Sequence, residues 1–449
     1  IRRDHVLLSE LTDLPIEGPD HKIKRLTQDS RQVEKYCLFA AAVGTRIDGS
    51  KFIQDALAHG ATALLIHDDV DLPDHLELND IAIVRTPNVR QELAHMAARY
   101  FKLQPEHIAA VTGTSGKTST VYFTQQLWTA LGYKAASFGT LGVRGPGMVR
   151  SGSMTTPDPI ALQGEVADLA SAGVSHLSIE ASSHGLDQYR LDGLKIKTAA
   201  FTNLSHEHLD YHIEMEAYFS AKKRLFGDLL PEDGTAVLNA DIPEYAGLME
   251  ICERRKLNKI SFGRKGREIQ IKDISPQPDG QALKIEVFGQ SYDVLLPLVG
   301  EFQAYNALCA LGIVAAGFRN DTDRIKTLIA HLEHLKGAPG RLQRIPGHPK
   351  GAVYVDYAHK PEALRSILTT LKPYARNRLI CVFGCGGDRD RDKRFIMGKI
   401  ADELADIVIV TDDNPRSEDP ATIRAAILKA TPNASEIGDR RDALRHSIN

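Results

Sequence analysis

A glycine-rich stretch at residues 108–120, IAAVTGTSGKTST, carries the residue types best suited to chemistry. Residues 108–111 are small and apolar and predict a buried strand, whereas the apolar spacing after residue 117 predicts a helix. Glycines at such a junction let backbone N–H groups approach phosphate oxygens, and the helix start adds partial positive charge. The stretch therefore predicts a phosphate-binding loop.

Two side chains of this loop have predicted roles toward a nucleoside triphosphate. Lys117 would reach the terminal phosphates, and the Thr118 hydroxyl would hold Mg²⁺. Val111 stands where the longer form of the pattern has a glycine, so the loop is a shortened one. A glycine turn with no ligand is the alternative, which Gly-Lys-Thr at a strand-to-helix junction disfavours.

Further polar residues follow the predicted strands at 176–180 and 198–203, where ligands of parallel sheets bind. Glu180 could hold a hard cation beside the nucleotide. The run SHEHLDYH at 205–212 gathers histidines and carboxylates, which suits zinc, a mixed oxygen and imidazole shell around Mg²⁺, or a solvated loop. Its spacing does not tell which histidine matters. Lys222, on a predicted helix just beyond, reads by itself as a solvated charge.

Three polar segments of the C-terminal third, at 356–361, 384–390 and 413–416, also follow predicted strands. We expect these strand ends on one edge of a second sheet, where they would form a second ligand surface. Arg389 and Arg416 could each bind a carboxylate through a guanidinium fork, with surface salt bridges as the alternative.

Alternating strand and helix patterns predict an α/β protein in three units, at residues 1–104, 105–337 and 338–449. Residues 269–298 instead predict an antiparallel meander, followed by a helix at 304–316. Expected strands lie at 37–42, 61–66, 81–84, 108–111, 176–180, 198–203, 235–239, 352–356, 379–383 and 407–411. Expected helices lie at 52–59, 89–100, 118–131, 161–172, 216–230, 361–371 and 421–430.

The composition is that of an ordinary globular protein. The 449 residues have a formal net charge of -3, which indicates neither a nucleic-acid nor a membrane partner. No apolar run has the length of a membrane span, and the start lacks a signal-peptide core. The five cysteines are scattered in apolar contexts, so we expect reduced thiols and a cytoplasmic protein. Without an initial Met, the chain is expected to be trimmed or a fragment.

Ten motifs together resemble the Mur ligases, in order and over the whole chain. They are GTSGKTS, TTPD, EASSHGLDQYR, FTNLSHEHLDYH, AKKRLF, GEFQAYN, PGR, DYAHKPEAL, GCGGDRDRDKR and DNPRSEDP. The resemblance implies a UDP-binding N-terminal domain, a central ATP-binding domain with a P-loop ATPase-type parallel sheet, and a C-terminal Rossmann-like domain that binds the amino acid. DNPR resembles the version that adds meso-diaminopimelate, because its arginine suits the far carboxylate.

The reaction implied by the resemblance is ATP-dependent amide-bond formation in peptidoglycan synthesis, and so in cell-wall biogenesis, cell shape and division. ATP phosphorylates the D-glutamyl carboxylate of UDP-N-acetylmuramoyl-L-alanyl-D-glutamate. The amine of meso-diaminopimelate then attacks the acyl phosphate, with release of ADP and phosphate. The implied partners are these small molecules and Mg²⁺, and the implied state is a monomer.

The resemblance also assigns residues position by position. The catalytic set is Lys117, Glu180, His208 and Lys222, and Mg²⁺ would be held by Thr118, Glu180, His208 and Lys222, the last as a carbamate. ATP would contact Gly113, Thr114, Ser115, Gly116, Lys117, Thr118, Ser119, Asn306, Arg341, Asp356 and His359. The UDP-sugar dipeptide would contact Ser30, Thr155, Thr156, Ser182, Gln188 and Arg190. Diaminopimelate would contact Arg389, Asp413, Asn414 and Arg416.

Four departures from the family pattern set limits on this assignment. Glu207 replaces an aspartate, Ile213 replaces a glycine, and Gln303 replaces an asparagine expected near the adenine. The family's GKGHE-like segment, which also contacts diaminopimelate, has no counterpart before Asn449, so we expect a truncated third domain or an impaired variant. Alternatives are a lysine-adding Mur ligase, a folylpolyglutamate synthetase-like ligase and a non-enzymatic nucleotide-binding scaffold.

Overall fold

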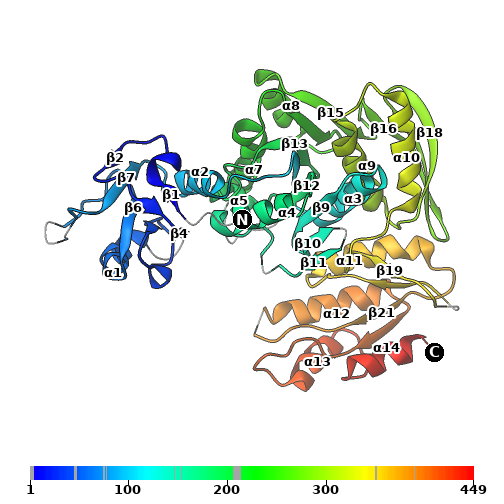
Figure 1. The fold of residues 1–449 in the computed structure, drawn as a ribbon. Helices are drawn as coiled ribbons and strands as arrows, with labels where there is room; N and C mark the ends of the chain where they lie inside the picture. Colours follow the sequence, from blue (N-terminus) through cyan, green and yellow to red (C-terminus); the bar gives the residue numbers. More distant parts are fainter. Residues whose placement is uncertain are drawn as a thin grey trace. The chain divides into compact units, whose positions relative to one another are not determined.

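The computed structural model describes residues 5–44, 48–73, 76, 78–145, 147–152, 154–205, 214–348, 351–388 and 390–448. The chain forms two compact units, one of residues 1–270 and 306–328 and the other of residues 271–305 and 329–449. Each unit combines sheets with covering helices (Figure 1), so the predicted α/β class is confirmed.

The N-terminal part of the first unit is a five-stranded sheet in the order β2-β7-β6-β5-β4. Strands β4 to β7 run parallel, and β2 runs antiparallel to β7. Its elements are β2 (Ile16–Glu17), β4 (Arg25–Thr27), β5 (Cys37–Ala40), α1 (Ile53–Ala58), β6 (Ala61–His67), β7 (Ala82–Thr86) and α2 (Val89–Phe101). Helix α2 packs Val89, Leu93 and Met96 onto one face, and α1 packs Ile53 and Ala56 with the core of the other.

The central part of the first unit is built around β8 (His107–Thr112). Strand order is β11-β10-β9-β12-β8-β13-β14-β15, in which all strands except β10 and β11 are parallel. The strands are β9 (Ala135–Gly139), β10 (Gly142–Gly145), β11 (Met148–Arg150), β12 (His176–Glu180), β13 (Ile196–Phe201), β14 (Thr235–Asn239) and β15 (Asn258–Gly263). The helices are α3 (Lys117–Ala130), α4 (Pro159–Ser171), α5 (Ser183–Asp187), α7 (Met215–Arg224) and α8 (Tyr245–Arg254).

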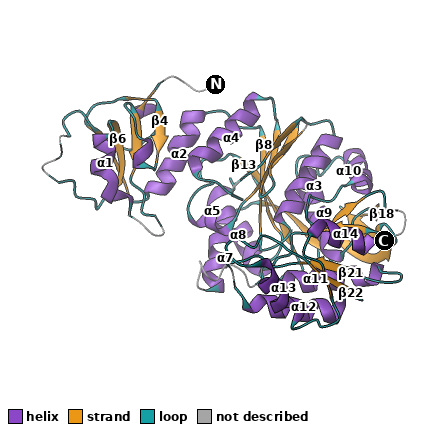
Figure 2. Cartoon of the chain, turned by 90° about the horizontal axis from the view of Figure 1, so that it is seen from below, coloured by secondary structure: helices purple, strands orange, loops and turns teal. Residues whose placement is uncertain are grey.

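The strand register brings the predicted chemistry to one edge of this sheet. Glu180 at the end of β12 pairs with Val111, and Phe201 at the end of β13 pairs with Thr112. Helices α3 and α4 lie on opposite faces of these strands (Figure 2), and α4 contributes Leu162, Val166 and Leu169 to the core of its face. The phosphate loop, the segment after Glu180 and the segment after Phe201 therefore start side by side.

The second unit contains a β-hairpin and a smaller α/β part. Strands β17 (Gly280–Val287) and β18 (Gln290–Leu296) pair antiparallel, as the predicted meander requires, but β16 (Ile269–Gln277) begins parallel to β15 within the first unit. The other elements are β19 (Gln343–Ile345), β20 (Val353–Val355), α11 (Pro361–Leu371), β21 (Ile380–Phe383), α12 (Asp392–Leu404), β22 (Ile407–Val410), α13 (Pro420–Leu428), β23 (Ser435–Glu436) and α14 (Arg440–Ile448). Helices α9 (Glu301–Ala315) and α10 (Thr322–Ala330) each have residues in both units.

One prediction about local structure was wrong, and one predicted helix is present but differs in the type of its last turn. The strand before residue 356, β20, pairs antiparallel with β19, whereas β21, β22 and β23 form a separate parallel sheet. The three polar strand ends therefore do not share one sheet edge. The helix expected at 216–230 ends as an α-helix at Arg224 and continues as a π-helical turn at Leu225–Leu229.

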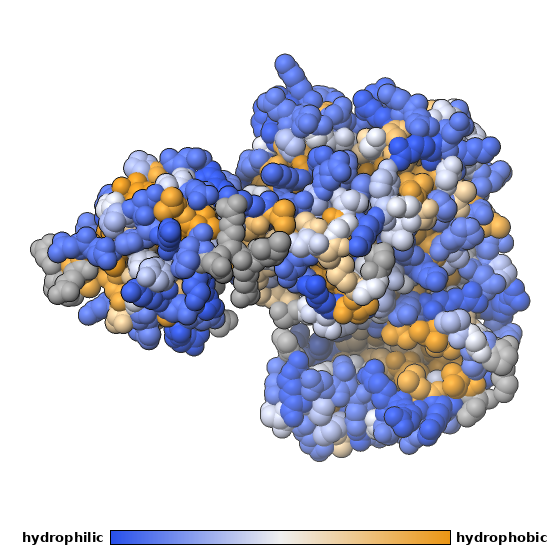
Figure 3. All heavy atoms as spheres, in the orientation of Figure 1, coloured by the Kyte–Doolittle hydropathy of each residue, from blue (hydrophilic) through white to orange (hydrophobic). Residues whose placement is uncertain are grey.

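The surface and the thiols agree with the sequence pattern. Figure 3 shows mainly hydrophilic residues on the face turned to the viewer. The five cysteines are free and buried, as predicted. No helix among the described residues combines the length and the apolar character needed to cross a membrane.

Stacked histidine rings lie at the amino ends of β8 and β12, opposite to the phosphate loop. His107 and His176 are the first residues of the two strands, and their ring centroids are 4.5 Å apart. The Tyr133 ring stacks on His176 with a centroid distance of 4.0 Å. Burial disfavours the charged imidazolium and lowers the pKa of His176 from 6.5 to about 4.

This histidine predicts a pH dependence of stability. Below pH 6.5 the unfolded chain takes up a proton that folded His176 refuses, so stability falls as the pH drops from 6.5 toward 4 and is unaffected above. His176→Gln should make the loss in urea unfolding free energy between pH 7 and pH 5 smaller. His59→Gln, at a side chain that is 48% exposed, is the control for the removal of one surface imidazole. An equally steep slope in His176→Gln would contradict the assignment.

Candidate active site

The phosphate loop joins β8 to α3 and contains two glycines with positive φ angles. Gly113 has a φ of 140° and Gly116 a φ of 86°, which side chains with a Cβ rarely adopt. A Cβ on Gly113 would overlap the Thr202 hydroxyl, and one on Gly116 would overlap the Asn306 carboxamide oxygen. Gly116 is the N-cap residue of α3 and has no side chain of its own to cap the helix. The loop thus presents a helix N-terminus suited to an anion, and Asn306 lies directly against it.

Residues after β13 hold the loop in place. The Asn203 carbonyl accepts from the Thr114 amide at 2.8 Å, and its side-chain oxygen accepts from the Ser115 amide at 2.9 Å. The Thr202 hydroxyl donates to the Ser115 carbonyl at 2.6 Å. Because Asn203 engages the amides of Thr114 and Ser115, we expect the loop to offer a phosphate its amides from Gly116 onward.

Two lysine amines meet at the same carbonyl oxygen of the loop. Lys117 Nζ donates to Gly113 O at 2.8 Å and to Thr114 O at 2.7 Å, and Lys222 Nζ donates to Gly113 O at 2.8 Å. Lys222 is only 1% exposed, and its amine lies 4.4 Å from the centroid of the Tyr218 ring. Two ammonium groups so close repel each other, which favours an anion at this position.

Glu180 lies at the end of the neighbouring strand and is 1% exposed. Its carboxylate accepts from the Thr140 amide at 2.8 Å and from the Thr140 hydroxyl at 3.2 Å. Gly139 provides the space for this carboxylate, since a Cβ at position 139 would overlap it. Thr118, in the first turn of α3, is 7% exposed. A carboxylate and a hydroxyl are oxygen ligands of the kind that Mg²⁺ prefers, so these two residues fit the ion.

Five of the six residues assigned to the UDP-sugar dipeptide form one hydrogen-bonded cluster beside Glu180. Thr156 Oγ1 donates to the Glu180 carbonyl at 3.0 Å and accepts from Ser182 Oγ at 3.0 Å. Arg190 donates to the Thr156 carbonyl at 2.7 Å and to Gln188 Oε1 at 2.7 Å. Thr155 Oγ1 lies 3.0 Å from the Thr140 hydroxyl and so connects to the Glu180 carboxylate.

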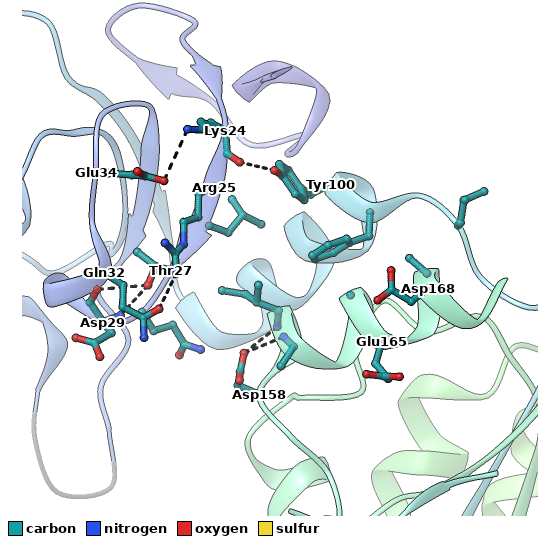
Figure 4. A pocket seen from close by; sticks show the side chains of 18 of the residues that line it. Lys24, Arg25, Thr27, Asp29, Gln32, Glu34, Tyr100, Asp158, Glu165 and Asp168 are labelled. Atoms are coloured by element: carbon teal, nitrogen blue, oxygen red, sulfur yellow. Dashed lines mark hydrogen bonds and ion pairs between the residues drawn. The ribbon is translucent and has the colours of Figure 1, made fainter. Parts of the chain in front are cut away.

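Ser30, the sixth residue, lies in the N-terminal part, in the 3-10 helix Ser30–Gln32. Its neighbours Thr27, Gln28 and Asp29 line a cavity of about 920 Å³, whose opposite wall is α4 from Asp158 onward. Figure 4 shows Asp29 and Gln32 on one side of this cavity and Asp158 and Glu165 on the other. Residues close in sequence to Ser30 and to Thr156 thus line one cavity large enough for a nucleotide-sized ligand.

Three residues assigned to ATP lie in the second unit and are near one another. Arg341 stacks over the Tyr357 ring at 5.2 Å, and its carbonyl accepts from Gln303 Nε2 at 3.2 Å. Asp356 accepts from the amides of Leu342 and Ala358 at 2.6 and 2.8 Å. Burial raises the pKa of Asp356, against the lowering effect of these bonds and of Arg341. His359 Nδ1 lies 3.1 Å from the Tyr357 carbonyl.

The segments after β21 and β22 are tied together around the residues assigned to diaminopimelate. The Gly387 amide donates to the Asn414 carbonyl at 2.9 Å, and the Arg416 guanidinium donates to the Gly387 carbonyl. Asp413 follows the end of β22 by three residues and directly precedes Asn414. These contacts bring Asn414 and Arg416 beside Gly387, so two of the three predicted polar strand ends adjoin each other. The assignment of these residues to diaminopimelate stays a prediction.

An ion pair between Arg394 and Glu418 connects these two segments. Arg394 on α12 donates to Glu418 at 2.7 and 3.0 Å, and Glu418 also accepts from the Asp388 amide at 2.7 Å. The bond from Arg394 lowers the pKa of Glu418 to about 2. Arg394 is 3% exposed, so this pair sets the loop geometry.

Two assigned residues, His208 and Arg389, lie outside the described residues, as do the departures Glu207 and Ile213. The histidine cluster at 206–212, with its open choice between ligand shells, also falls there.

Comparison with known proteins gives the family. Models described as "Mur ligase family, catalytic domain", "Mur ligase middle domain" and "Mur ligase, glutamate ligase domain" match residues 22–101, 111–314 and 340–449. A curated relative from Mesorhizobium japonicum, named UDP-N-acetylmuramoyl-L-alanyl-D-glutamate--2,6-diaminopimelate ligase, is 48% identical over 442 residues, covering 97% of this chain and 89% of the relative. The chain belongs to the Mur ligase family.

Further relatives and solved structures agree. A ligase of the same name from Bradyrhizobium diazoefficiens is 49% identical over 424 residues, covering 94% of this chain and 85% of the relative. A solved structure of a 2,6-diaminopimelate ligase superposes with a TM-score of 0.76 at 33% identity, covering 98% of this chain and 90% of that one. MurF from Thermotoga maritima in complex with ADP has a TM-score of 0.56 at 20% identity, covering 94% and 96%, and shows the fold. As a Mur ligase, this chain is an ATP-dependent ligase.

Several residues of this Mur ligase site were not predicted from the sequence. Thr140 holds Glu180, Asn203 holds the phosphate loop, and Tyr218 packs on Lys222. The sequence did indicate Asn203, because a polar residue at the end of a predicted strand is expected at the ligand edge of the sheet. Tyr218 had a helical spacing of four from Lys222, which places both on one helix face. Nothing in the sequence around Thr140 indicated its role, since the residue that it binds, Glu180, is 40 positions away.

Proposed function

We propose that this Mur ligase adds meso-diaminopimelate to UDP-N-acetylmuramoyl-L-alanyl-D-glutamate, with ATP converted to ADP and phosphate. The observation that carries the proposal is the pair of lysine amines, Lys117 and buried Lys222, on the Gly113 carbonyl of the phosphate loop. The names of the relatives at 48% and 49% identity supply the substrates. The reaction belongs to peptidoglycan synthesis.

The chemistry proceeds in two steps. A carboxylate oxygen of the D-glutamyl residue attacks the terminal phosphorus of ATP, the bond to ADP breaks, and an acyl phosphate forms. The amine of the incoming amino acid then attacks the acyl carbon, loses a proton and expels phosphate, leaving an amide. Lys117 neutralises charge on the transferring group, which lets one anion approach another.

The phosphate loop contributes position as well as charge. Asn203 and Thr202 hold its backbone rigid before ATP arrives, so little reorganisation is needed at the moment of transfer. Thr118 and Glu180, with His208 and Lys222 from the resemblance, would hold Mg²⁺. The ion would supply charge neutralisation on the phosphates.

Lys222 is proposed to act as a carbamate. Carbon dioxide bonded to its amine turns a cation into an anion, which removes the repulsion from Lys117 and provides oxygen ligands. The burial of Lys222 at 1% exposure supports this, because burial in a low-dielectric environment disfavours a cationic amine.

The remaining assignments stay proposals from the resemblance. Ser30, Thr155, Thr156, Ser182, Gln188 and Arg190 would bind the UDP-sugar dipeptide, and Asn306, Arg341, Asp356 and His359 would bind ATP. Arg389, Asp413, Asn414 and Arg416 would bind diaminopimelate. A cytoplasmic monomer fits substrates that are small soluble nucleotides and amino acids.

A panel of amino acids tests the substrate. Phosphate release is measured with this protein, ATP, Mg²⁺ and the UDP-linked dipeptide, and each amino acid in turn. We expect turnover with meso-diaminopimelate and at least on the order of 10²-fold lower kcat/KM with lysine, because lysine leaves the carboxylate site unpaired. Equal use of lysine would contradict the specificity. No turnover with any amino acid would favour the hypothesis of a nucleotide-binding scaffold. Turnover with a folate substrate would favour the hypothesis of a folylpolyglutamate synthetase-like ligase.

A further inference from the structure

One arginine connects the helix that carries Lys222 to the segment that carries two substrate residues. Arg224 ends α7, and its guanidinium donates to the Leu186 carbonyl at the end of α5 and to Asp192 at 3.1 Å. Its Cζ atom lies 4.0 Å above the Tyr189 ring. Helices α5 and α7 lie side by side in both views (Figures 1 and 2). Arg224 thus contacts residues 186–192, which we call the α5–β13 segment, at three points.

The partner carboxylate is buried and has a second donor. Asp192 is 4% exposed and accepts from Gln91 Nε2 on α2 at 2.9 Å. Burial raises the pKa of Asp192 and the Arg224 charge opposes that rise. A buried carboxylate without its arginine would be strongly unfavourable, so the pair strongly constrains the two elements it joins.

The α5–β13 segment needs such a constraint. Tyr189 has a φ of 57°, an uncommon conformation for a residue with a large side chain. The residues on either side of it, Gln188 and Arg190, are hydrogen-bonded to each other at 2.7 Å, and Arg190 donates to the Thr156 carbonyl. Stacking of Arg224 on Tyr189 stabilises the turn that directs these two side chains.

We propose that Asp192 and Arg224 are positioning residues, which fix the substrate-binding side chains Gln188 and Arg190 relative to α7 and Lys222. Neither needs to contact a substrate. Lys222 reaches the phosphate loop from one side of α7 while Arg224 holds the α5–β13 segment from another. The inference rests on the proposed function, because Gln188 and Arg190 are assigned to the UDP-sugar dipeptide there.

The test replaces the charge of the carboxylate and nothing else. Asp192→Asn keeps the shape of the side chain but removes the ion pair. We expect kcat/KM for the UDP-linked dipeptide to fall on the order of tenfold to 10²-fold, mainly through KM, because small displacements of positioning groups have such effects. KM for ATP should stay within about twofold, since no hydrogen bond or ion pair among the described residues joins the phosphate loop to Asp192 or Arg224. Arg224→Lys, which keeps the charge but loses the fork and the planar stack, should act in the same direction.

The control is Asp228→Asn. Asp228 also pairs with Arg224, at 3.0 Å, but it is 55% exposed and belongs to the helical turn Leu225–Leu229 that continues α7, not to the α5–β13 segment. This variant should be close to the unchanged protein. Thermal unfolding and ADP affinity verify that each variant is folded, and if Asp192→Asn does not fold, Arg224→Lys decides.

The outcomes separate this inference from the proposed function. If the unchanged protein releases phosphate and the folded variants show an unchanged KM for the UDP-linked dipeptide, or equal increases for ATP and for the dipeptide, the positioning role is wrong. If the unchanged protein neither turns over nor binds the dipeptide, the proposed function fails and this inference with it. A selective rise for the dipeptide supports both. A double replacement no worse than the worse single one would show that the two residues act as a unit.

Discussion

Lys222→Ala is expected to lower the rate of amide formation on the order of 10³-fold, the size of effect seen when a single key charge-stabilising group is removed. Lys222 is buried at 1% exposure, and its amine lies on the same Gly113 carbonyl as that of Lys117. Its replacement removes the group that would become the carbamate. Phosphate release at saturating substrates measures the loss.

Chemical rescue distinguishes a carbamate from a structural amine. A short carboxylic acid, added in excess, can enter the space left by the side chain and return part of the rate, since it supplies the missing carboxylate oxygens. Lys223→Ala is the control, because Lys223 is the next residue on the same helix and pairs with Glu216 at 3.3 Å near the surface. ADP affinity of Lys222→Ala, measured in parallel, tests whether the loop is intact. Near-normal rates without rescue would refute the carbamate role.

The elements that position the site were predictable because short-range pattern and long-range packing agree there. Strands β12 and β14 have the predicted bounds, since each is a short run between turn residues and helix patterns. The phosphate loop was predictable for the same reason, as its glycines and its helix start are contiguous in sequence. The helix α12 was not expected, because its polar start, DRDKR, continues the polar loop motif.

The environment of Lys222 was not predictable from its local pattern. AKKRLF reads as a charged helix face, and only the resemblance assigned Lys222 a role. The hydrogen bond of its amine reaches the Gly113 carbonyl, 109 positions away, and the amine also lies over the Tyr218 ring. The contacts of the α5–β13 segment were not predicted for a similar reason, because Asp192, Arg224 and Gln91 come from three different parts of the fold. The π-helical turn after Arg224 likewise has no signal in residue type.

Gly116→Ala is expected to lower kcat/KM for ATP on the order of 10²-fold or more, because it both strains and displaces the phosphate loop. Gly116 has a φ of 86°, so any Cβ costs roughly 1 kcal/mol in backbone strain. That Cβ would also overlap the Asn306 carboxamide, which is assigned to the nucleotide. The loop must then move at the point where α3 begins and its amides face a phosphate.

Gly132→Ala is the matched control, since it has the same kind of backbone and none of the crowding. Gly132 has a φ of 88° just after α3, and an added Cβ there meets nothing within 4 Å. The two variants should lose comparable stability from backbone strain, as measured by urea unfolding, but only Gly116→Ala should lose affinity for ATP in a nucleotide titration. Equal affinities would mean that the loop tolerates displacement at Gly116, and that Asn306 and the start of α3 do not define the phosphate site. A selective loss would tie nucleotide binding to the contact between Gly116 and Asn306.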